Sequence, residues 1–315
     1  MKPWTKRLMV MLATWLLCAC GHDFDDKISE SSYAVKVSSK ADTEGAILGQ
    51  IIIQTLEHNG IRTIHQLQLG DTQTVRSALL AGKIDIYPEY TGNGAFLIGE
   101  PNDPVWKDAA AAYAHIQKVD AQTNQVIWLT PAPTNNVWSI ALRRDLVDAH
   151  GLNSLGDLAR WLNTGKNDFK LVASAEFVKR PDALKAMEQA YGFSLRPEQL
   201  IVLEGGDTST MIQAAGQGTK GINAAMVYGT DEAIMSAFNL IILSDSKGSE
   251  IVYQPTPIIR ESILMAKPRI KEVLDPVFRS LTAQNLKKLN ARVTLESVDA
   301  KQVAIDYLKE EGFMK

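Results

Sequence analysis

The chain has 315 residues, 45% of them hydrophobic, and this length allows one large domain or two domains of medium size. Its 33 basic and 36 acidic residues nearly balance and form no basic block, so nucleic acid is not an expected partner.

The N-terminal segment has the pattern of an export signal. Three basic residues among the first seven precede the apolar stretch 8–17, which is too short to span a membrane. The stretch ends in L-C-A-C (residues 17–20), which resembles the lipobox of bacterial lipoproteins. The resemblance implies cleavage before Cys20 and attachment of a diacylglycerol to its sulfur. A plain secretory peptide, cleaved nearby, is the alternative.

We therefore expect residues 1–19 to be a lipoprotein signal peptide and the polar residues 20–32 to be a flexible tether. The protein is then exported, either periplasmic or on the cell surface, and meets the membrane only through its lipid anchor. Because Cys18 and Cys20 are the only cysteines and Cys18 leaves with the signal, the mature chain cannot form an internal disulfide.

Strands and helices alternate from residue 33 onward. Period-two apolar patterns predict strands over 33–38 and 64–69, and apolar residues at helical spacing predict helices over 46–59 and 71–80. A third strand follows at 84–87. This β-α-β-α-β order is typical of a mostly parallel sheet.

The stretch 83–94, K-I-D-I-Y-P-E-Y-T-G-N-G, carries the first candidate site. We expect Pro88 to end the strand, because proline has no amide hydrogen to donate. Residues 89–94 should form a loop, with Gly92 and Gly94 at positive φ. The tyrosines of this stretch would then lie at the carboxyl end of a strand, where ligands bind in open α/β sheets.

The remainder of the chain continues the alternation. We expect a helical stretch at 103–124, a strand at 126–129 and a turn-rich crossover at 130–136. Further strands are predicted over 137–143, 170–174, 199–203, 224–228 and 240–243, and further helices over 154–162, 181–191, 207–215, 275–281 and 300–311.

A short sequence pattern occurs twice, once before and once after the crossover at 130–136. The pattern D-T-x-T at 71–74 recurs at 207–210, and each copy is followed by a helix, a strand and a tyrosine. This arrangement indicates two similar α/β lobes. We place the first lobe at 33–136 plus 244–315 and the second at 137–243, with the chain crossing twice between them.

The sequence contains no recognisable catalytic constellation. Its five histidines show no H-E-x-x-H spacing, no cysteine pair is available for zinc, and neither a G-x-S-x-G elbow nor a Walker loop is present. We therefore expect no catalytic site, no metal site and no cofactor.

Aromatic residues gather instead at strand ends and crossovers, namely Tyr87, Tyr90, Trp138, Tyr228 and Tyr253. A quaternary ammonium has no N–H to donate, and proteins hold it by placing aromatic faces around it. Taken singly, each ring has core packing as its alternative role. Their joint recurrence at loop positions favours a cage.

Several motifs together resemble the substrate-binding proteins of quaternary-amine ABC importers, of the osmoprotectant type. They are S-K-A-D-T-E-G-A-I-L-G-Q, I-D-I-Y-P-E-Y-T-G-N-G, P-T-N-N-V-W, S-A-E-F-V-K-R-P-D-A-L, Y-G-F and M-V-Y-G-T-D-E. The resemblance covers nearly all of the mature chain. It implies a bilobed α/β class II periplasmic-binding-protein fold, with two mixed or parallel sheets, helices on their faces and a double-crossover hinge.

The resemblance also implies site residues. The cage would consist of Tyr90, Trp138, Tyr228 and Tyr253, with Asn136 as a polar neighbour. Lys40, Asn93 and Arg180 match positions near the ligand's carboxylate or hydroxyl, and Tyr87 and Asp85 lie beside them in the sequence. For Arg180, which precedes a proline, the alternative is an exposed arginine at a helix start. Three positions depart from the family: Trp138 replaces a tyrosine, Gly45 a glutamine and Asn93 a threonine.

The implied function is capture of a small quaternary amine such as glycine betaine or choline, and its delivery to the transmembrane subunits of a permease. The protein is expected to be a monomer and not an enzyme. One alternative is a ligand-loaded sensor with a chemoreceptor as partner. Another is an enzyme on the same fold, for which Asp85 and Glu89 are the available carboxylates.

Overall fold

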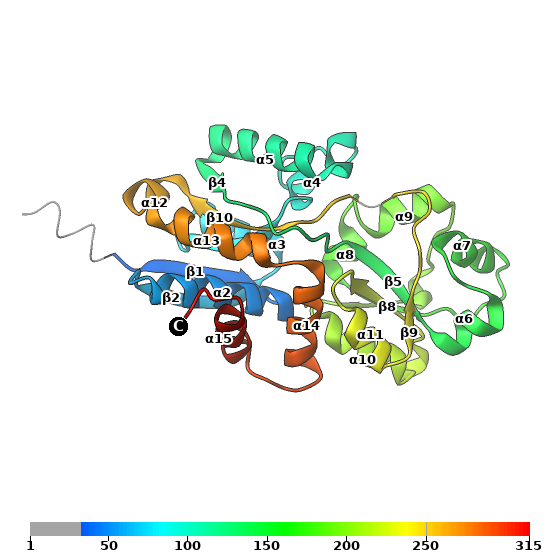
Figure 1. Cartoon of the computed structure of the whole chain (residues 1–315). Coiled ribbons are helices and arrows are strands. Elements are labelled where there is room, and N and C mark those ends of the chain that lie inside the picture. The colour runs from blue at the N-terminus through cyan, green and yellow to red at the C-terminus, as the bar shows by residue number, and fades with distance from the viewer. Residues whose placement is uncertain (1–32, 250) are drawn as a thin grey trace, which may run out of the picture. The chain divides into compact units, whose positions relative to one another are not determined.

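The computed structural model describes residues 33–249 and 251–315, and residues from Ala34 to Lys315 form one compact body. The expected signal peptide, the anchor residue Cys20 and the tether 20–32 lie outside the described residues. The body contains two five-stranded sheets, each covered by helices (Figure 1). We call each sheet with its own helices a lobe.

The first lobe has the strand order β2-β1-β3-β10-β4. Its strands are β1 (Val35–Lys40), β2 (Thr63–Gly70), β3 (Ile86–Tyr90), β4 (Val126–Trp128) and β10 (Pro255–Arg260). β1 pairs in parallel with β2 and β3, whereas β10 runs antiparallel to both β3 and β4. The chain therefore returns from the second lobe to insert β10 into the first sheet.

The second lobe repeats this plan, with the order β7-β6-β8-β5-β9. Its strands are β5 (Trp138–Arg143), β6 (Leu171–Ser174), β7 (Leu200–Leu203), β8 (Ala224–Tyr228) and β9 (Leu240–Ile242). β6 is parallel to β7 and β8, and β5 is antiparallel to β8 and β9. The prediction of a bilobed α/β fold with two mixed sheets is confirmed.

The helices lie between the strands as the alternation predicts, with several additions. They are α2 (Thr43–His58), α3 (Thr72–Leu80), α4 (Asn93–Leu97), α5 (Ala109–Asn124), α6 (Arg144–His150), α7 (Leu155–Asn163), α8 (Ala175–Lys179), α9 (Leu184–Tyr191), α10 (Thr208–Gly216), α11 (Glu232–Ala237), α12 (Glu261–Ala266), α13 (Arg269–Ser280), α14 (Ala283–Thr294) and α15 (Ala300–Glu310). Short 3₁₀ turns occupy Pro104–Lys107, Pro197–Gln199 and Thr219–Gly221.

Helices α2 and α3 begin where β1 and β2 end, and each has an aspartate N-cap. Asp42 accepts a hydrogen bond from the amide of Gly45, and Asp71 accepts one from the amide of Thr74. The β1–β2 and β2–β3 connections run in opposite directions across the sheet, so right-handed crossovers put α2 and α3 on opposite faces. Both helix N-termini consequently lie at the carboxyl edge of the first sheet.

Strand β3 runs through Pro88, and the expectation that this proline ends the strand is wrong. Pro88 lies opposite Pro257 of β10. Alternate residue pairs of an antiparallel ladder exchange no hydrogen bonds, and two facing prolines suit such a pair because neither has an N–H. On its other side, Pro257 accepts a hydrogen bond from Leu129 at 2.9 Å, so the ladder continues to β4.

The expected positive φ at Gly92 and Gly94 is also wrong. Gly92 has φ −62°, and Gly94 lies inside α4 and not in a loop. What these positions require is space. A Cβ on Gly92 would lie 2.7 Å from the ring of Tyr253, and one on Gly94 would lie 2.6 Å from Trp106.

Two crossovers connect the lobes and lie side by side. The amide of Asn136 donates to the carbonyl of Tyr253 at 2.8 Å, and the amide of Tyr253 donates to the side-chain oxygen of Asn135 at 2.8 Å. Farther along, the amide of Ala132 donates to the carbonyl of Pro255 at 2.8 Å. These bonds join the two crossovers into one hinge.

Candidate functional site

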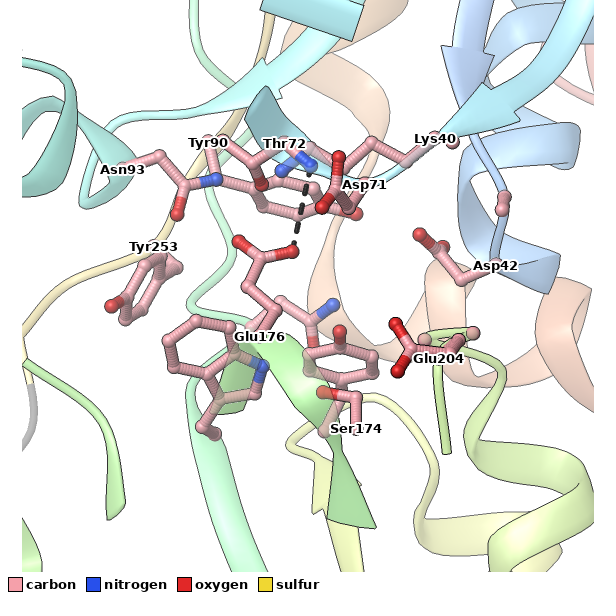
Figure 2. A pocket seen from close by; sticks show the side chains of 17 residues that line it. Lys40, Asp42, Asp71, Thr72, Tyr90, Asn93, Ser174, Glu176, Glu204 and Tyr253 are labelled. Atoms are coloured by element: carbon pink, nitrogen blue, oxygen red, sulfur yellow. Dashed lines mark hydrogen bonds between the residues drawn. The ribbon is translucent and has the colours of Figure 1, made fainter. Parts of the chain in front are cut away.

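A cavity of about 280 Å³ lies between the lobes, at the edges where strands of both sheets end. Its lining residues are Lys40, Ala41, Asp42, Gly70, Asp71, Thr72, Tyr90, Asn93, Asn136, Trp138, Ser174, Glu176, Glu204, Gly205, Gly206, Tyr228 and Tyr253. Figure 2 shows their side chains converging on one space. Such a crevice outside the carboxyl ends of strands is where α/β sheets bind ligands.

Four aromatic rings form part of this lining. Tyr90 ends β3, Tyr228 ends β8, Trp138 begins the antiparallel strand β5, and Tyr253 belongs to the second crossover. Trp138 and Tyr228 are register partners, so their side chains project from the same face of the second sheet. The rings of Trp138 and Tyr253 lie 5.5 Å apart at a tilt of 51°. The structure thus brings together the four predicted rings.

The hydroxyl groups of two of these tyrosines are bound by carboxylates. Tyr90 donates to Glu44 at 2.7 Å, and Tyr253 donates to Asp182 at 3.3 Å. Burial, together with the neighbouring carboxylates, raises the pKa of both phenols well above the usual value, so both stay protonated at neutral pH. Each phenol therefore acts as a fixed donor that holds its ring in place.

Lys40 and Asn93 line the cavity and share one buried partner, Glu89. The ammonium of Lys40 lies 2.7 Å from the Glu89 carboxylate and 4.9 Å from the centre of the Tyr90 ring. Asn93 donates to Glu89 at 2.6 Å. Burial acts to raise the pKa of Glu89, but the charge of Lys40 and these hydrogen bonds lower it below its usual value. Glu89 is accordingly an anion that positions both side chains.

Tyr87 and Arg180 are not part of the cavity lining. Tyr87 is fully buried and donates to Glu89 at 2.9 Å, so it lies behind Lys40 and Asn93. The other predicted neighbour, Asp85, is also buried and accepts a hydrogen bond from the amide of Lys36. Both side chains belong to the packing of the first lobe.

Arg180 is buried and lies directly behind the cavity wall. Its guanidinium carbon lies 4.5 Å from the centre of the Trp138 ring, and its guanidinium nitrogens form an ion pair with Asp182. It also donates to Asn93 at 2.7 Å and to Glu176 at 2.8 Å. The expected alternative of an exposed arginine does not describe this position, because the side chain is only 3% exposed.

Sequence reasoning missed Glu44, a buried carboxylate beneath Tyr90. One oxygen accepts from Tyr90 and from Asn136, and the other accepts from Thr230 at 2.6 Å and from Asn290 at 2.8 Å. These donors come from the first sheet, the hinge, the second lobe and α14. Burial raises the pKa of Glu44, while the donated hydrogen bonds act in the opposite direction.

The cavity lining also contains four carboxylates that the sequence did not single out: Asp42, Asp71, Glu176 and Glu204. Figure 2 shows Glu176 in the middle of the cavity, pointing toward Thr72, with Asp42 and Glu204 to one side. All four follow strand ends within a few residues, and this position is the sequence signal that would have found them. Lys40 is the single lysine or arginine among the lining residues.

Two kinds of feature are missing from the described part of the chain. Across residues 33–249 and 251–315, no group of three or more histidine, cysteine, aspartate or glutamate side chains is arranged to hold a metal ion. Within the same residues, every helix is too short or too polar to cross a bilayer.

Comparison with known proteins assigns the family. The family OpuAC, described as the substrate binding domain of an ABC-type glycine betaine transport system, matches residues 34–310. The chain belongs to this family. The glycine betaine-binding protein YehZ of Escherichia coli K12 is 51% identical over 286 residues, which are 91% of this chain and 93% of that protein.

Solved structures extend the comparison. The structure of apo YehZ from Escherichia coli, 52% identical, covers 90% of this chain and 100% of its own, with a TM-score of 0.65. Lactococcal OpuAC, solved closed with glycine betaine, is 14% identical and covers 89% of this chain and 100% of its own, with a TM-score of 0.58. At that identity the likeness concerns the fold alone. Members of the family are substrate-binding proteins of transporters and not enzymes.

Proposed function

We propose that the protein captures a quaternary ammonium osmolyte, such as glycine betaine or choline, and delivers it to the permease of an ABC importer. The observation that carries this proposal is the set of four aromatic rings around one cavity, of which Tyr90, Trp138 and Tyr253 are buried and Tyr228 is half-buried. Ring faces attract a cation that has no hydrogen to donate. The family and the glycine betaine-binding relative support the same ligand class.

The proposed roles of the polar residues follow from their contacts. Lys40, Asn93 and Asn136 border the cavity and face the polar end of the ligand. Arg180 is expected to reach a ligand's carboxylate at the place that Glu176 now holds, because Glu176 lines the cavity and accepts one of its hydrogen bonds. Tyr87 acts indirectly, by holding Glu89.

At the level of the cell, we propose a monomeric, exported lipoprotein, periplasmic or on the cell surface. Cys20 carries the lipid, residues 20–32 are the tether, and the lipid is the only membrane attachment. The proposed lobe boundaries are 33–136 plus 244–315 for the first lobe and 137–243 for the second. The two adjacent crossovers support these boundaries.

A calorimetric panel tests the ligand class. We expect glycine betaine and choline to bind, and 3,3-dimethylbutanol, the uncharged isostere of choline, to bind at least about tenfold more weakly because it lacks the charge. Trp138→Ala should weaken binding by about tenfold or more. Trp161→Ala is the matched control, since Trp161 is not among the cavity lining residues. Equal affinity for choline and its isostere would show that the rings are ordinary core residues.

A further inference from the structure

Glu176 extends from the second lobe into the cavity and contacts the first lobe. It lies on α8, two residues beyond the end of β6, and its side chain is 21% exposed. One carboxylate oxygen accepts a hydrogen bond from the backbone amide of Thr72 at 3.4 Å, which Figure 2 marks with a dashed line. The other oxygen accepts from Arg180 at 2.8 Å.

The two groups that bind Glu176 form a receptor for a carboxylate. Thr72 is the first residue of α3, where free amides and the helix dipole favour an anion. Arg180 contributes a guanidinium from the opposite lobe. Lys40, the one cation among the lining residues, is already paired with Glu89 at 2.7 Å, as Arg180 is with Asp182, so an anion in this part of the cavity must share its donors with carboxylates that already hold them.

We propose that Glu176 is a specificity-determining residue that competes with the carboxylate of zwitterionic ligands for these donors. The inference rests on the proposed quaternary-amine function. A zwitterion such as glycine betaine must displace Glu176 to place its own carboxylate on Thr72 and Arg180. Two carboxylates that shared these two donors would lie side by side and repel each other. Choline has the same trimethylammonium head but a hydroxyl at its other end, so it leaves Glu176 in place.

The preference for choline over a zwitterion is strengthened by three further carboxylates, Asp42, Asp71 and Glu204. They line the cavity with Glu176 and disfavour a second carboxylate within it. Glu204 differs from Glu176 in its contacts, because none of the described residues donates a hydrogen bond to it. It therefore carries the same charge without occupying the receptor, and this difference makes it the matched comparison.

The test is calorimetry of the wild type, Glu176→Gln and Glu204→Gln with glycine betaine, choline and tetramethylammonium. In Glu176→Gln we expect the affinity for glycine betaine, relative to choline, to rise by about tenfold or more. Glu204→Gln should shift this ratio by less than about threefold, because Glu204 is exposed and solvent screens its charge. An unchanged ratio in Glu176→Gln, or equal shifts in both variants, would overturn the proposal.

Tetramethylammonium separates the two hypotheses. It has the head group and no polar end, so its binding reports the rings alone. If no quaternary amine binds the wild type, the proposed function itself fails. If tetramethylammonium binds and the ratio does not move, only the role of Glu176 fails.

Crystal structures of the two wild-type complexes provide a measurement that needs no variant. With glycine betaine, the ligand's carboxylate should replace Glu176 at the amide of Thr72. With choline, Glu176 should keep its contacts with Thr72 and Arg180. Retention of the Glu176–Thr72 contact in the glycine betaine complex would contradict the competition.

Discussion

Tyr90 and Tyr253 show how one side chain can serve both packing and recognition. Each donates its hydroxyl to a carboxylate, Glu44 or Asp182, so the rotation of the ring is fixed. A phenol that donates to an anion is polarised toward its ring, and the ring face becomes more negative. Phenylalanine at either position would keep the ring but lose both effects. The carboxylates outside the cavity thereby assist the rings that line it.

A second residue-scale feature is Asp231, which follows Tyr228 by three positions. Its carboxylate accepts a hydrogen bond from the amide of Tyr228 at 2.8 Å. Burial raises the pKa of Asp231 to about 7, against the opposing effect of that hydrogen bond. Burial likewise raises the pKa of Asp42 and of Glu44.

These shifts predict how stability depends on pH. A carboxyl whose pKa is raised by folding binds more protons in the folded state, so the free energy of unfolding falls as pH rises from about 4 to about 7. Each such group contributes a slope of at most about 1.4 kcal/mol per pH unit. Asp231→Asn should make the slope shallower in urea unfolding measured between about pH 5 and pH 7. Glu89, whose pKa is lowered, affects the pH dependence of stability only below about pH 5. A variant with the wild-type slope would show that Asp231 does not titrate there.

At the scale of elements, α2 contacts several parts of the molecule that its sequence does not indicate as partners. Its apolar side packs on β1, β2 and β3 and on helices α13 and α15. Its first turn carries Glu44, whose four donors lie as far apart in sequence as Tyr90 and Asn290. The helix thus links the sheet, the hinge and the second lobe.

Replacing Glu44 by glutamine should cost stability. The amide retains one acceptor oxygen and puts an NH₂ group against two of the four donors, and each buried donor left unsatisfied costs about 1–3 kcal/mol. We expect a loss of about 2–5 kcal/mol in the free energy of unfolding, measured by urea titration. Glu57→Gln on the same helix is the control, because the half-exposed Glu57 should cost only about 1 kcal/mol or less. Equal losses in the two variants would mean that the hydrogen bonds of Glu44 contribute no more to the free energy of unfolding than those of an exposed glutamate.

The elements also show how far sequence reasoning extends. Periodicity and caps predict most strands and helices, because those signals are local, as at Asp71 and Asp207. Strand β10 escaped prediction because Pro255 and Pro257 argue against a central strand. Only the partner strand explains their presence, since Pro88 faces Pro257.

The residues of the candidate site also fall into two groups, those that the sequence could identify and those that it could not. Position at a strand end or crossover singled out five aromatic residues, and the family resemblance reduced them to the four rings that line the cavity. Glu44 and Glu176 could not be identified, because their roles depend on partners from other parts of the chain. The role of a carboxylate cannot be assigned until the groups that donate hydrogen bonds to it are known.

At the scale of the whole molecule, the proposed lipid anchor at Cys20 and the folded body should function independently. Cys20→Ser is expected to release the protein from membranes and leave the affinity for quaternary amines unchanged, because the polar segment 20–32 separates the lipid from the body. Membrane fractionation and calorimetry of the same preparation measure the two properties. A variant that stays with the membrane would contradict the lipobox.

The joined crossovers have a kinetic consequence. Tyr253 belongs to one crossover and Asn136 to the other, and both border the cavity, while the remaining walls come from both lobes. We therefore expect the walls to separate when the two lobes move apart at the hinge, and this movement should accompany the departure of a bound molecule. Exit and opening are then one event with one barrier, and its rate reflects the backbone at residues 135, 136 and 253. A transporter that forces this movement would release the bound molecule in the same step.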